Sequence, residues 1–209
     1  YLSNEPKILR LLSEQFHASV PVVIAINDEL HCFLMQDAGK TLREALKAKF
    51  KPELLCQAIK QYAAILRSTE EHIETFLKLG VPDWRLDKFP ILYEQMLSQT
   101  EFLKAEGLID QELQILRELS PKFLSQCSLL SSYGIPETLA YHDFHDKNVL
   151  FDPNTKRMTF VDWSETAIIH PFFSLYNCLQ QSTTHHGVIE DDQVYRKLQD
   201  ACFENWLGL

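Results

Sequence analysis

The sequence predicts an α+β fold, with a piece of β-sheet at the start, a mostly helical body after it and one small β-hairpin inside that body. Residues 20–26 and 30–35 are rich in β-branched or other large apolar side chains, which favours two paired strands. From residue 52 onward, apolar residues recur mainly at helical spacing. The exception is a pair of short apolar runs at 148–152 and 157–162, which predicts the hairpin.

Local signals place each element in order. A helix is predicted over residues 4–16, because Pro6 suits a first turn and the apolar residues recur every three or four positions. The dipeptide Asn27-Asp28 supplies the turn between the first two strands, and Asp152-Pro153-Asn154 supplies the turn of the later hairpin. Gly80 ends the longest helical stretch. The other helices are predicted near Thr41 and over 52–79, 90–105, 110–129 and most of 171–209.

The composition argues against several classes of protein. Of the 209 residues, 45% are hydrophobic, which suffices for a sizeable core, and a net charge of −9 argues against nucleic acid as a partner. Acidity suits a cationic small molecule better, although it is also common in soluble enzymes of any kind. No apolar run approaches the ~18 residues of a membrane span, so no membrane partner is expected. The five cysteines include no C-x-x-C pair, and their odd number argues against a disulfide framework, which predicts a reducing, cytoplasmic compartment.

The residues that carry chemistry are concentrated between positions 141 and 163. The stretch reads Tyr-His-Asp-Phe-His-Asp-Lys-Asn-Val-Leu from Tyr141 and Val-Asp-Trp from Val161. Phosphoryl transfer requires a base or orienting group for the attacking hydroxyl, and oxygen ligands for magnesium that bridges the phosphates. Asp143 can face the hydroxyl, and the side-chain oxygen of Asn148, five residues later, can face the metal.

The predicted hairpin supplies a second metal ligand. Asn148 opens its first strand, and Asp162 ends its second strand 14 residues later. Because a hairpin returns its far end to its start, we expect Asp162 to lie beside Asn148. Two oxygen ligands, completed by phosphates and waters, form the kind of shell that Mg²⁺ prefers.

This stretch resembles the catalytic loop of the aminoglycoside phosphotransferase and choline kinase superfamily, which usually reads H-G-D-L-H-P-G-N before two hydrophobic residues. Val-Asp-Trp resembles the family element that corresponds to D-F-G in protein kinases. The resemblance implies a protein-kinase-like fold, ATP and Mg²⁺ as cofactors, Asp143 as catalytic base, and Asn148 and Asp162 as metal ligands. His145 takes the position of the histidine that shapes the loop. The departures from the usual pattern lie beside these positions, at Tyr141, His142, Asp146 and Lys147.

Two further segments extend the resemblance over nearly the whole chain. Phe-Leu-Met-Gln-Asp-Ala-Gly, which includes Met35, is similar to the hinge that links the two lobes and receives adenine. The expected hydrogen bonds come from the Gln36 carbonyl and the Ala38 amide. Glu5 is similar in placement to the helix glutamate that pairs with a phosphate-binding lysine, although Glu14 lies on the same helix.

The resemblance also implies how the chain is organised. Residues 1–38 are expected to be the remainder of an N-terminal β-lobe plus the hinge, and residues 39–209 a mostly helical C-terminal lobe with the catalytic β-hairpin and the substrate pocket. The six glycines are scattered, so none forms a phosphate-cradling loop. Because the sequence starts at Tyr1, we expect the glycine-rich loop and the strand lysine to precede it, and we expect weak ATP binding without them.

The leading hypothesis is therefore an ATP-dependent kinase that phosphorylates a hydroxyl of a small molecule, with aminoglycosides, choline-like amines, sugars and homoserine all open as acceptors. One alternative is a catalytically inactive kinase-fold module that binds partners. Another is a metallohydrolase whose zinc ligands would be drawn from His142, His145, Asp146 and His170. A requirement for zinc without nucleotide would favour the hydrolase. The oligomeric state is left open.

Overall fold

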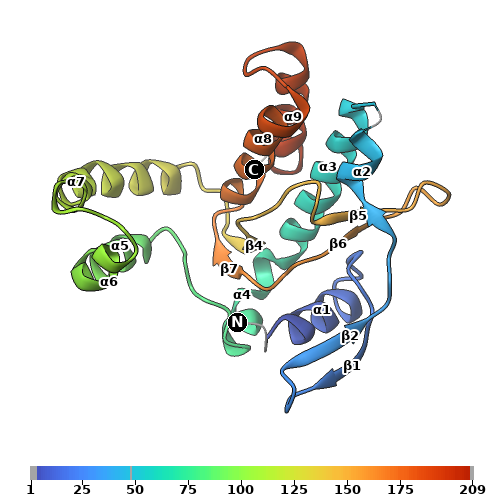
Figure 1. The fold of residues 1–209 in the computed structure, drawn as a ribbon, viewed down its shortest axis with the longest axis horizontal. Coiled ribbons are helices and arrows are strands. Elements are labelled where there is room, and N and C mark those ends of the chain that lie inside the picture. The colour runs from blue at the N-terminus through green and yellow to red at the C-terminus, as the bar shows by residue number, and fades with distance from the viewer. Residues whose placement is uncertain (1–3, 48, 208–209) are drawn as a thin grey trace.

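The computed structural model describes residues 4–47 and 49–207, and it has the predicted α+β class (Figure 1). None of the helices in these ranges combines the length and the apolar character needed to cross a membrane. The elements, in chain order, are α1 (Glu5–Glu14), β1 (Val23–Asn27), β2 (Cys32–Met35), β3 (Lys40–Thr41), α2 (Leu42–Lys47), α3 (Pro52–Thr69), a 3-10 turn (Glu70–His72), α4 (Ile73–Lys78), α5 (Phe89–Ser98), α6 (Thr100–Ala105), α7 (Asp110–Ser132), β4 (Thr138–Tyr141), β5 (Val149–Phe151), β6 (Met158–Phe160), β7 (Thr166–Ile169), α8 (Phe172–His186), α9 (Gln193–Phe203) and a second 3-10 turn (Glu204–Trp206).

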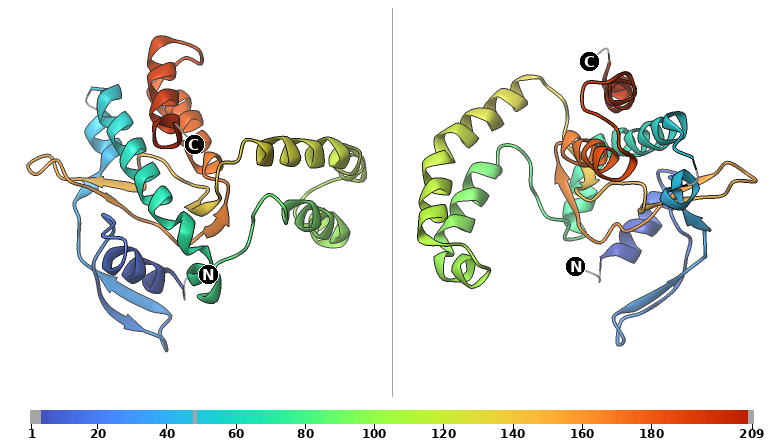
Figure 2. Two further views of the ribbon diagram at one scale, coloured as in Figure 1. Left: turned by 180° about the vertical axis from the view of Figure 1, so that it is seen from behind. Right: turned by 45° about the horizontal axis from the view of Figure 1, so that its top comes forward.

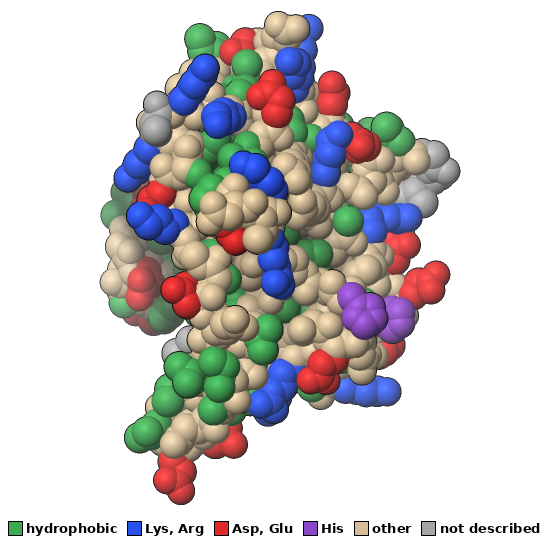
Figure 3. All heavy atoms as spheres, turned by 90° about the vertical axis from the view of Figure 1, so that its right-hand side faces the viewer, with side chains coloured by type: hydrophobic (Ala, Val, Ile, Leu, Met, Phe, Trp, Pro, Cys, Tyr) green, Lys and Arg blue, Asp and Glu red, His purple; other side chains and the backbone are tan. Residues whose placement is uncertain are grey.

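The first two strands form the predicted antiparallel hairpin. Ile26 lies opposite Phe33, and the amide of Leu30 donates to the side chain of Asn27 within the turn. The hairpin stands at the edge of the molecule, so Ile24 and Leu34 remain more than half exposed. Figure 3 shows apolar side chains gathered on this protruding hairpin at the lower edge of the face in view.

Three strands were not predicted from the sequence. β3 pairs with β5, with Thr41 opposite Leu150, and extends the catalytic hairpin into a sheet of order β3-β5-β6. β4 and β7 pair over four residues each, with Thr138 opposite Ile169. Every residue of β4 and β7 is buried, so neither strand shows the alternation that identifies a half-buried strand in a sequence.

Two of the predicted helices are interrupted. The helix predicted over 52–79 breaks after Thr69, whose hydroxyl accepts a hydrogen bond of 3.1 Å from the amide of Leu139 and so ties the end of α3 to β4. The helix predicted over 90–105 breaks at Gln99, whose ψ of 50° is not helical. The first of these breaks involves a partner 70 positions away, which local periodicity does not reveal.

An aromatic cluster forms the centre of the core. The ring of Tyr62, on α3, stacks on Phe144 at 3.8 Å between centroids, and it also contacts Tyr141, Phe160 and Trp163. Each of these five side chains is at most 1% exposed. Aromatic pairs contribute about 0.5–1.5 kcal/mol each beyond the burial of their area. Because four of the five belong to β4, β6 or the loops that adjoin them, this packing holds the chemical segment in place.

The segment between α1 and β1 is joined to the catalytic hairpin. The carbonyl of Ser19 accepts a hydrogen bond from the amide of Phe160, and the Ser19 hydroxyl donates to the carbonyl of Met158. Leu9 of α1 belongs to the same core cluster as the aromatic residues. The two segments on either side of the predicted boundary at residue 38 thus share one core, and the boundary itself stays a prediction.

Helices α5, α6 and α7 form an arm that stands apart from the body in every view (Figures 1 and 2). The arm has a small core of its own, built on Leu97, Leu103 and Leu113. It contacts the body through aromatic rings: the ring centroids of Phe89 and of Phe173, at the start of α8, are 5.6 Å apart.

Candidate active site

The register of the catalytic hairpin brings the two candidate metal ligands together. Val149 lies opposite Phe160, and one step further the amide of Val161 donates to the carbonyl of Asn148 over 3.0 Å. Asp162 follows Val161 directly. The structure therefore places Asp162 beside the start of β5, as the hairpin argument requires.

The side chain of Asn148 is oriented by the loop that precedes it. Its amide nitrogen donates to the backbone carbonyl of Asp143 over 3.0 Å, and its own backbone amide donates to the carbonyl of His145 over 2.9 Å. The nitrogen of the side chain is thus directed into the loop, and the oxygen is directed away from it. The Asn148 amide oxygen and the Asp162 carboxylate form a donor set of the hard, oxygen-rich kind that suits Mg²⁺.

Asp143 stands at the mouth of the loop with its carboxylate half-exposed. The Nε2 atom of His145 lies 3.3 Å from one carboxylate oxygen, and the Nδ1 atom of His145 accepts from the amide of Lys147 over 3.3 Å. His145 therefore contacts both ends of the turn around it, which is the geometry expected of a residue that shapes the loop. The amide nitrogen of Asn177, on α8, lies 3.5 Å from the other oxygen of Asp143.

Asp162 adopts an unusual backbone conformation. Its φ of 64° lies in the left-handed region, where residues other than glycine are uncommon. The hydroxyl of Ser164 donates to its carboxylate over 2.8 Å. The next side chain, Trp163, is fully buried, and its indole nitrogen donates to the carbonyl of Phe160 over 2.9 Å. The buried ring fixes the chain immediately after Asp162.

The structure distinguishes the two glutamates of α1. Glu14 is exposed, whereas Glu5 is buried and accepts a hydrogen bond of 3.0 Å from the amide of Trp163. Burial raises the pKa of Glu5 above its ordinary value; the Trp163 amide works in the opposite direction, and the nearby charge of Asp162 adds to the increase. Glu5 therefore lies next to the candidate metal ligand, while its pairing with a lysine stays a prediction.

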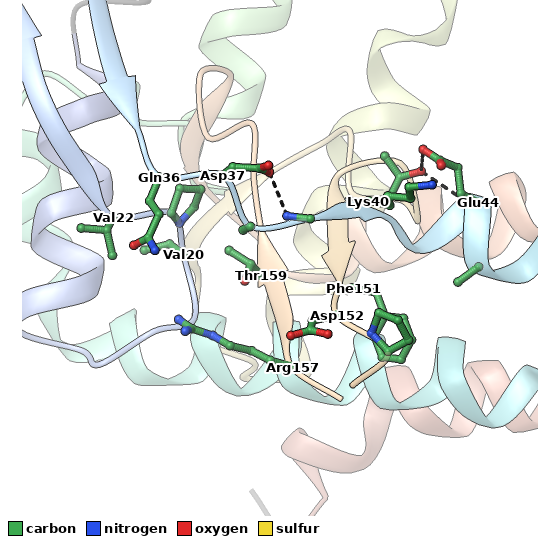
Figure 4. Close-up of a pocket in the computed structure, with 16 residues that line it drawn as sticks. Val20, Val22, Gln36, Asp37, Lys40, Glu44, Phe151, Asp152, Arg157 and Thr159 are labelled. Atoms are coloured by element: carbon green, nitrogen blue, oxygen red, sulfur yellow. Dashed lines mark hydrogen bonds between the residues drawn. The ribbon is translucent and has the colours of Figure 1, made fainter. Parts of the chain in front are cut away.

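The predicted hinge begins within β2, and the residues that follow this strand border a cavity of about 780 Å³ (Figure 4). Gln36 and Ala38 line it, together with Val20 and the turn of the catalytic hairpin, where Arg157 reaches across the lower side of the view. Among the described residues that line this cavity, none belongs to the catalytic loop, and Met35 is not included. The contacts expected between the hinge and adenine stay a prediction.

A family profile described as "Phosphotransferase enzyme family" matches residues 2–207. The chain belongs to this phosphotransferase family. The match covers nearly the whole sequence and confirms the resemblance found in the loop around Asp143. No match was found among the curated proteins.

Solved structures of phosphotransferases share the fold at low sequence identity. A choline/ethanolamine kinase family protein from Mesorhizobium loti superposes with a TM-score of 0.61 at 18% identity, over 97% of this chain and 61% of that one. The amicoumacin kinase hAmiN, in complex with AMP-PNP, Ca²⁺ and Ami, gives 0.64 at 15% identity, over 99% and 61% of the two chains. The aminoglycoside phosphotransferase APH(3'')-Id from Streptomyces rimosus, in complex with ADP and streptomycin, gives 0.59 at 14% identity, over 98% and 74%. The chain thus spans about three-fifths of the first two structures.

The zinc-hydrolase alternative finds no support in the geometry. Within residues 4–47 and 49–207, no three His, Cys, Asp or Glu side chains are grouped so that they could hold a metal ion. His142 lies 3.5 Å from Glu165 at the surface, and His145 faces Asp143. His170 is fully buried, and this burial lowers its pKa to about 4.

The structure adds three site residues that sequence reasoning missed. Asn177 approaches Asp143 from α8, and Arg43 and His186 bind Asp146 within the catalytic loop. None of the three lies in a motif, and they come from α2 and α8, far from the loop in sequence. The unusual Asp146, at a position where the family usually has proline, was the one available signal. Burial acts to raise the pKa of Asp146, but the hydrogen bonds from Arg43 and His186 outweigh it and hold the pKa below its ordinary value.

Proposed function

We propose that this chain carries the catalytic loop and the metal-binding hairpin of a kinase that transfers the γ-phosphate of ATP to a hydroxyl group of a small molecule. The observation that carries the proposal is the hydrogen bond from Val161 to Asn148, which brings Asp162 beside Asn148 at the end of the hairpin that Asp143 precedes. A base and two oxygen ligands in this arrangement are what phosphoryl transfer requires of a protein.

Each residue has a separate role in this proposal. The Asp143 carboxylate accepts the proton of the attacking hydroxyl, and its half-exposed position leaves room for an acceptor to approach. The Asn148 oxygen and the Asp162 carboxylate would hold Mg²⁺, which would neutralise charge on the phosphates of the nucleotide. His145 keeps the loop in the conformation that directs Asp143 outward. Gln36 and Ala38 bind the base of the nucleotide through their backbone.

The nucleotides and substrates of the similar structures support this proposal at the level of class. ADP with streptomycin in one of them, and AMP-PNP with Ca²⁺ and Ami in another, are consistent with a nucleotide, a divalent cation and a small acceptor. The acceptor of this chain is proposed to be a hydroxylated small molecule. The negative net charge of the protein is compatible with a cationic acceptor.

The test is an ADP-release assay on the natural full-length protein, with a panel of hydroxylated amines, sugars and aminoglycosides as acceptors. We expect ADP release that depends on Mg²⁺ and on one acceptor. Asp143→Asn should lower this release at least about 100-fold. Asp110→Asn is the matched control, because it makes the same substitution at an exposed carboxylate on the arm. Nucleotide binding without transfer to any acceptor would favour a binding module, and zinc-dependent hydrolysis without nucleotide would contradict the kinase.

A further inference from the structure

Asp146 is held from two sides inside the catalytic loop. It is 3% exposed, and both of its carboxylate oxygens have a partner. The Nε atom of Arg43 donates to Oδ1 over 2.7 Å, and the Nε2 atom of His186 lies 2.7 Å from Oδ2. The Nη2 atom of Arg43 is 2.6 Å from Oδ1 as an ion-pair contact outside hydrogen-bond alignment. We call these three residues the Arg43–Asp146–His186 cluster.

The backbone of Asp146 is fixed as well as its side chain. Its carbonyl accepts a hydrogen bond of 3.1 Å from the amide of Arg43. Asp146 lies three positions after Asp143 and two before Asn148, so a shift of Asp146 moves both residues. Within the loop itself, Asn148 and His145 add hydrogen bonds, but these bonds join loop residues to one another and not to the body.

The two partners of Asp146 come from separate parts of the fold. Arg43 lies in the first turn of α2. This helix directly follows β3, which comes after the hinge and pairs with β5 through Thr41 and Leu150. His186 ends α8, and the ring of Phe50 stacks on it at 4.7 Å between centroids. The cluster thus connects the hinge side and the C-terminal helices to one residue of the catalytic loop.

Such a cluster is not expected to add much to the net free energy of unfolding. Removing two charges from water costs free energy that their attraction often only balances, and buried ion pairs can frequently be replaced by apolar residues without loss of stability. What a pair with fixed geometry does supply is a defined position for the chain that carries it. Phosphoryl transfer depends strongly on such positioning, because the reacting groups must be in line and in contact.

We propose that Arg43 and His186 are positioning residues, which act through Asp146 to hold Asp143 and Asn148 in the geometry that transfer requires. The proposal rests on the kinase function above, but its structural part can be tested without activity. Loss of one partner should loosen the loop and lower turnover, and should leave binding of the nucleotide base at the hinge nearly unchanged.

The test compares His186→Leu, which removes the hydrogen bond, with His186→Gln, whose amide can reach the same oxygen. Leu179→Ala, a buried change on α8 away from Asp146, is the control for general destabilisation. Phe50→Leu is a milder variant that removes only the ring stacked on His186. Three quantities are measured for each variant: thermal unfolding, hydrogen exchange of amides in residues 141–151, and kcat and KM for ATP in the ADP-release assay.

For His186→Leu we expect hydrogen exchange in residues 141–151 to accelerate at least about tenfold beyond what the change in global stability explains. We expect kcat to fall roughly 10- to 100-fold, and KM for ATP to stay within about twofold of the wild-type value. His186→Gln should return both the exchange rate and kcat most of the way to their wild-type values. Phe50→Leu should change both quantities in the same direction as His186→Leu, but by less. If His186→Leu does not fold, His186→Gln and Phe50→Leu decide alone. The proposal is overturned if exchange and kcat in the His186 and Phe50 variants follow global stability as they do in Leu179→Ala. If the wild-type protein transfers no phosphate, the proposed function fails, while the exchange pattern still decides whether the cluster holds the loop.

Discussion

The backbone amide of Trp163 donates a hydrogen bond of 3.0 Å to the carboxylate of Glu5, although 158 positions separate the two residues in sequence. The bond fixes α1 against the segment that follows Asp162, and it satisfies a buried backbone donor. It also places a carboxylate with a raised pKa next to a second carboxylate. The first prediction concerns this contact.

Glu5→Ala should destabilise the chain of residues 1–209 by about 1–3 kcal/mol, because it leaves the buried Trp163 amide without an acceptor. Glu5→Gln keeps an acceptor and should cost less. Since the folded state raises the pKa of Glu5, the wild-type protein loses stability as the pH rises above the ordinary value of 4.5, whereas Glu5→Gln does not. Urea unfolding of the three proteins between pH 4.5 and 7 measures this, and parallel curves for wild type and Glu5→Gln would contradict it.

Asp143→Asn should lower kcat roughly 10²- to 10⁴-fold with little change in the affinity for nucleotide. The carboxylate is proposed to act on the acceptor hydroxyl and not on ATP, so binding and turnover should separate. Steady-state kinetics and nucleotide titration on the same preparations provide the two measurements. Near-wild-type turnover would remove Asp143 from the role of base.

Asp162→Ala should weaken binding of Mg-ATP more than Asn148→Ala does. A carboxylate is the stronger ligand for a hard cation, and Asp162 is the only charged residue of the proposed pair. Titration calorimetry with ATP, in Mg²⁺ and then in EDTA, isolates the metal-dependent part of the binding. Normal Mg-ATP affinity in Asp162→Ala would show that the metal assignment is wrong.

His170 should make the protein sensitive to acid. Burial holds its pKa at about 4, compared with 6.5 in an unfolded chain, so between these values the unfolded state binds a proton that the folded state does not. Stability therefore falls as the pH drops through this window, by roughly 3 kcal/mol in full. His170→Asn, whose side-chain oxygen can still accept from the amide of Phe172, should remove this part of the pH dependence. Denaturant unfolding of both proteins at pH 7, 5.5 and 4 gives the difference, and equal losses in the two proteins would contradict the prediction.

Leu113→Ala should destabilise the arm without unfolding the body. Leu113 is fully buried in the small core shared by α5, α6 and α7, and loss of a buried leucine typically costs about 2–5 kcal/mol. Because this core is separate from the main cluster, hydrogen exchange should accelerate in residues 89–132 and stay unchanged in α3. Leu66→Ala, in the main core, is the matched control and should affect α3 directly. Equal acceleration in both regions after Leu113→Ala would mean that arm and body unfold together.

The sequence was sufficient for the parts of the fold that depend on local signals. The catalytic hairpin, the helix that carries Glu5 and the strand pair before the hinge were predicted close to their observed bounds, since turns and apolar spacing define them. β4 was missed because all four of its residues are buried. The break in the long helix was missed because local periodicity does not mark it, although the end of α3 is bonded to Leu139, 70 positions away. Arg43 and His186 could not be predicted as partners of Asp146, because only the folded chain brings them together.

The hydrogen bonds between Ser19 and β6 also have a consequence for synthesis of the protein. Ser19 leaves the ribosome 139 residues before Met158. At translation rates of about 5–20 residues per second, this interval is on the order of 10 s. During that time Leu9 and Leu12 of α1, which end fully buried, lack the hairpin residues that belong to the same core cluster. The nascent chain therefore carries an apolar helix without its later partners for this interval, which lengthens the time available to chaperones that bind exposed apolar segments.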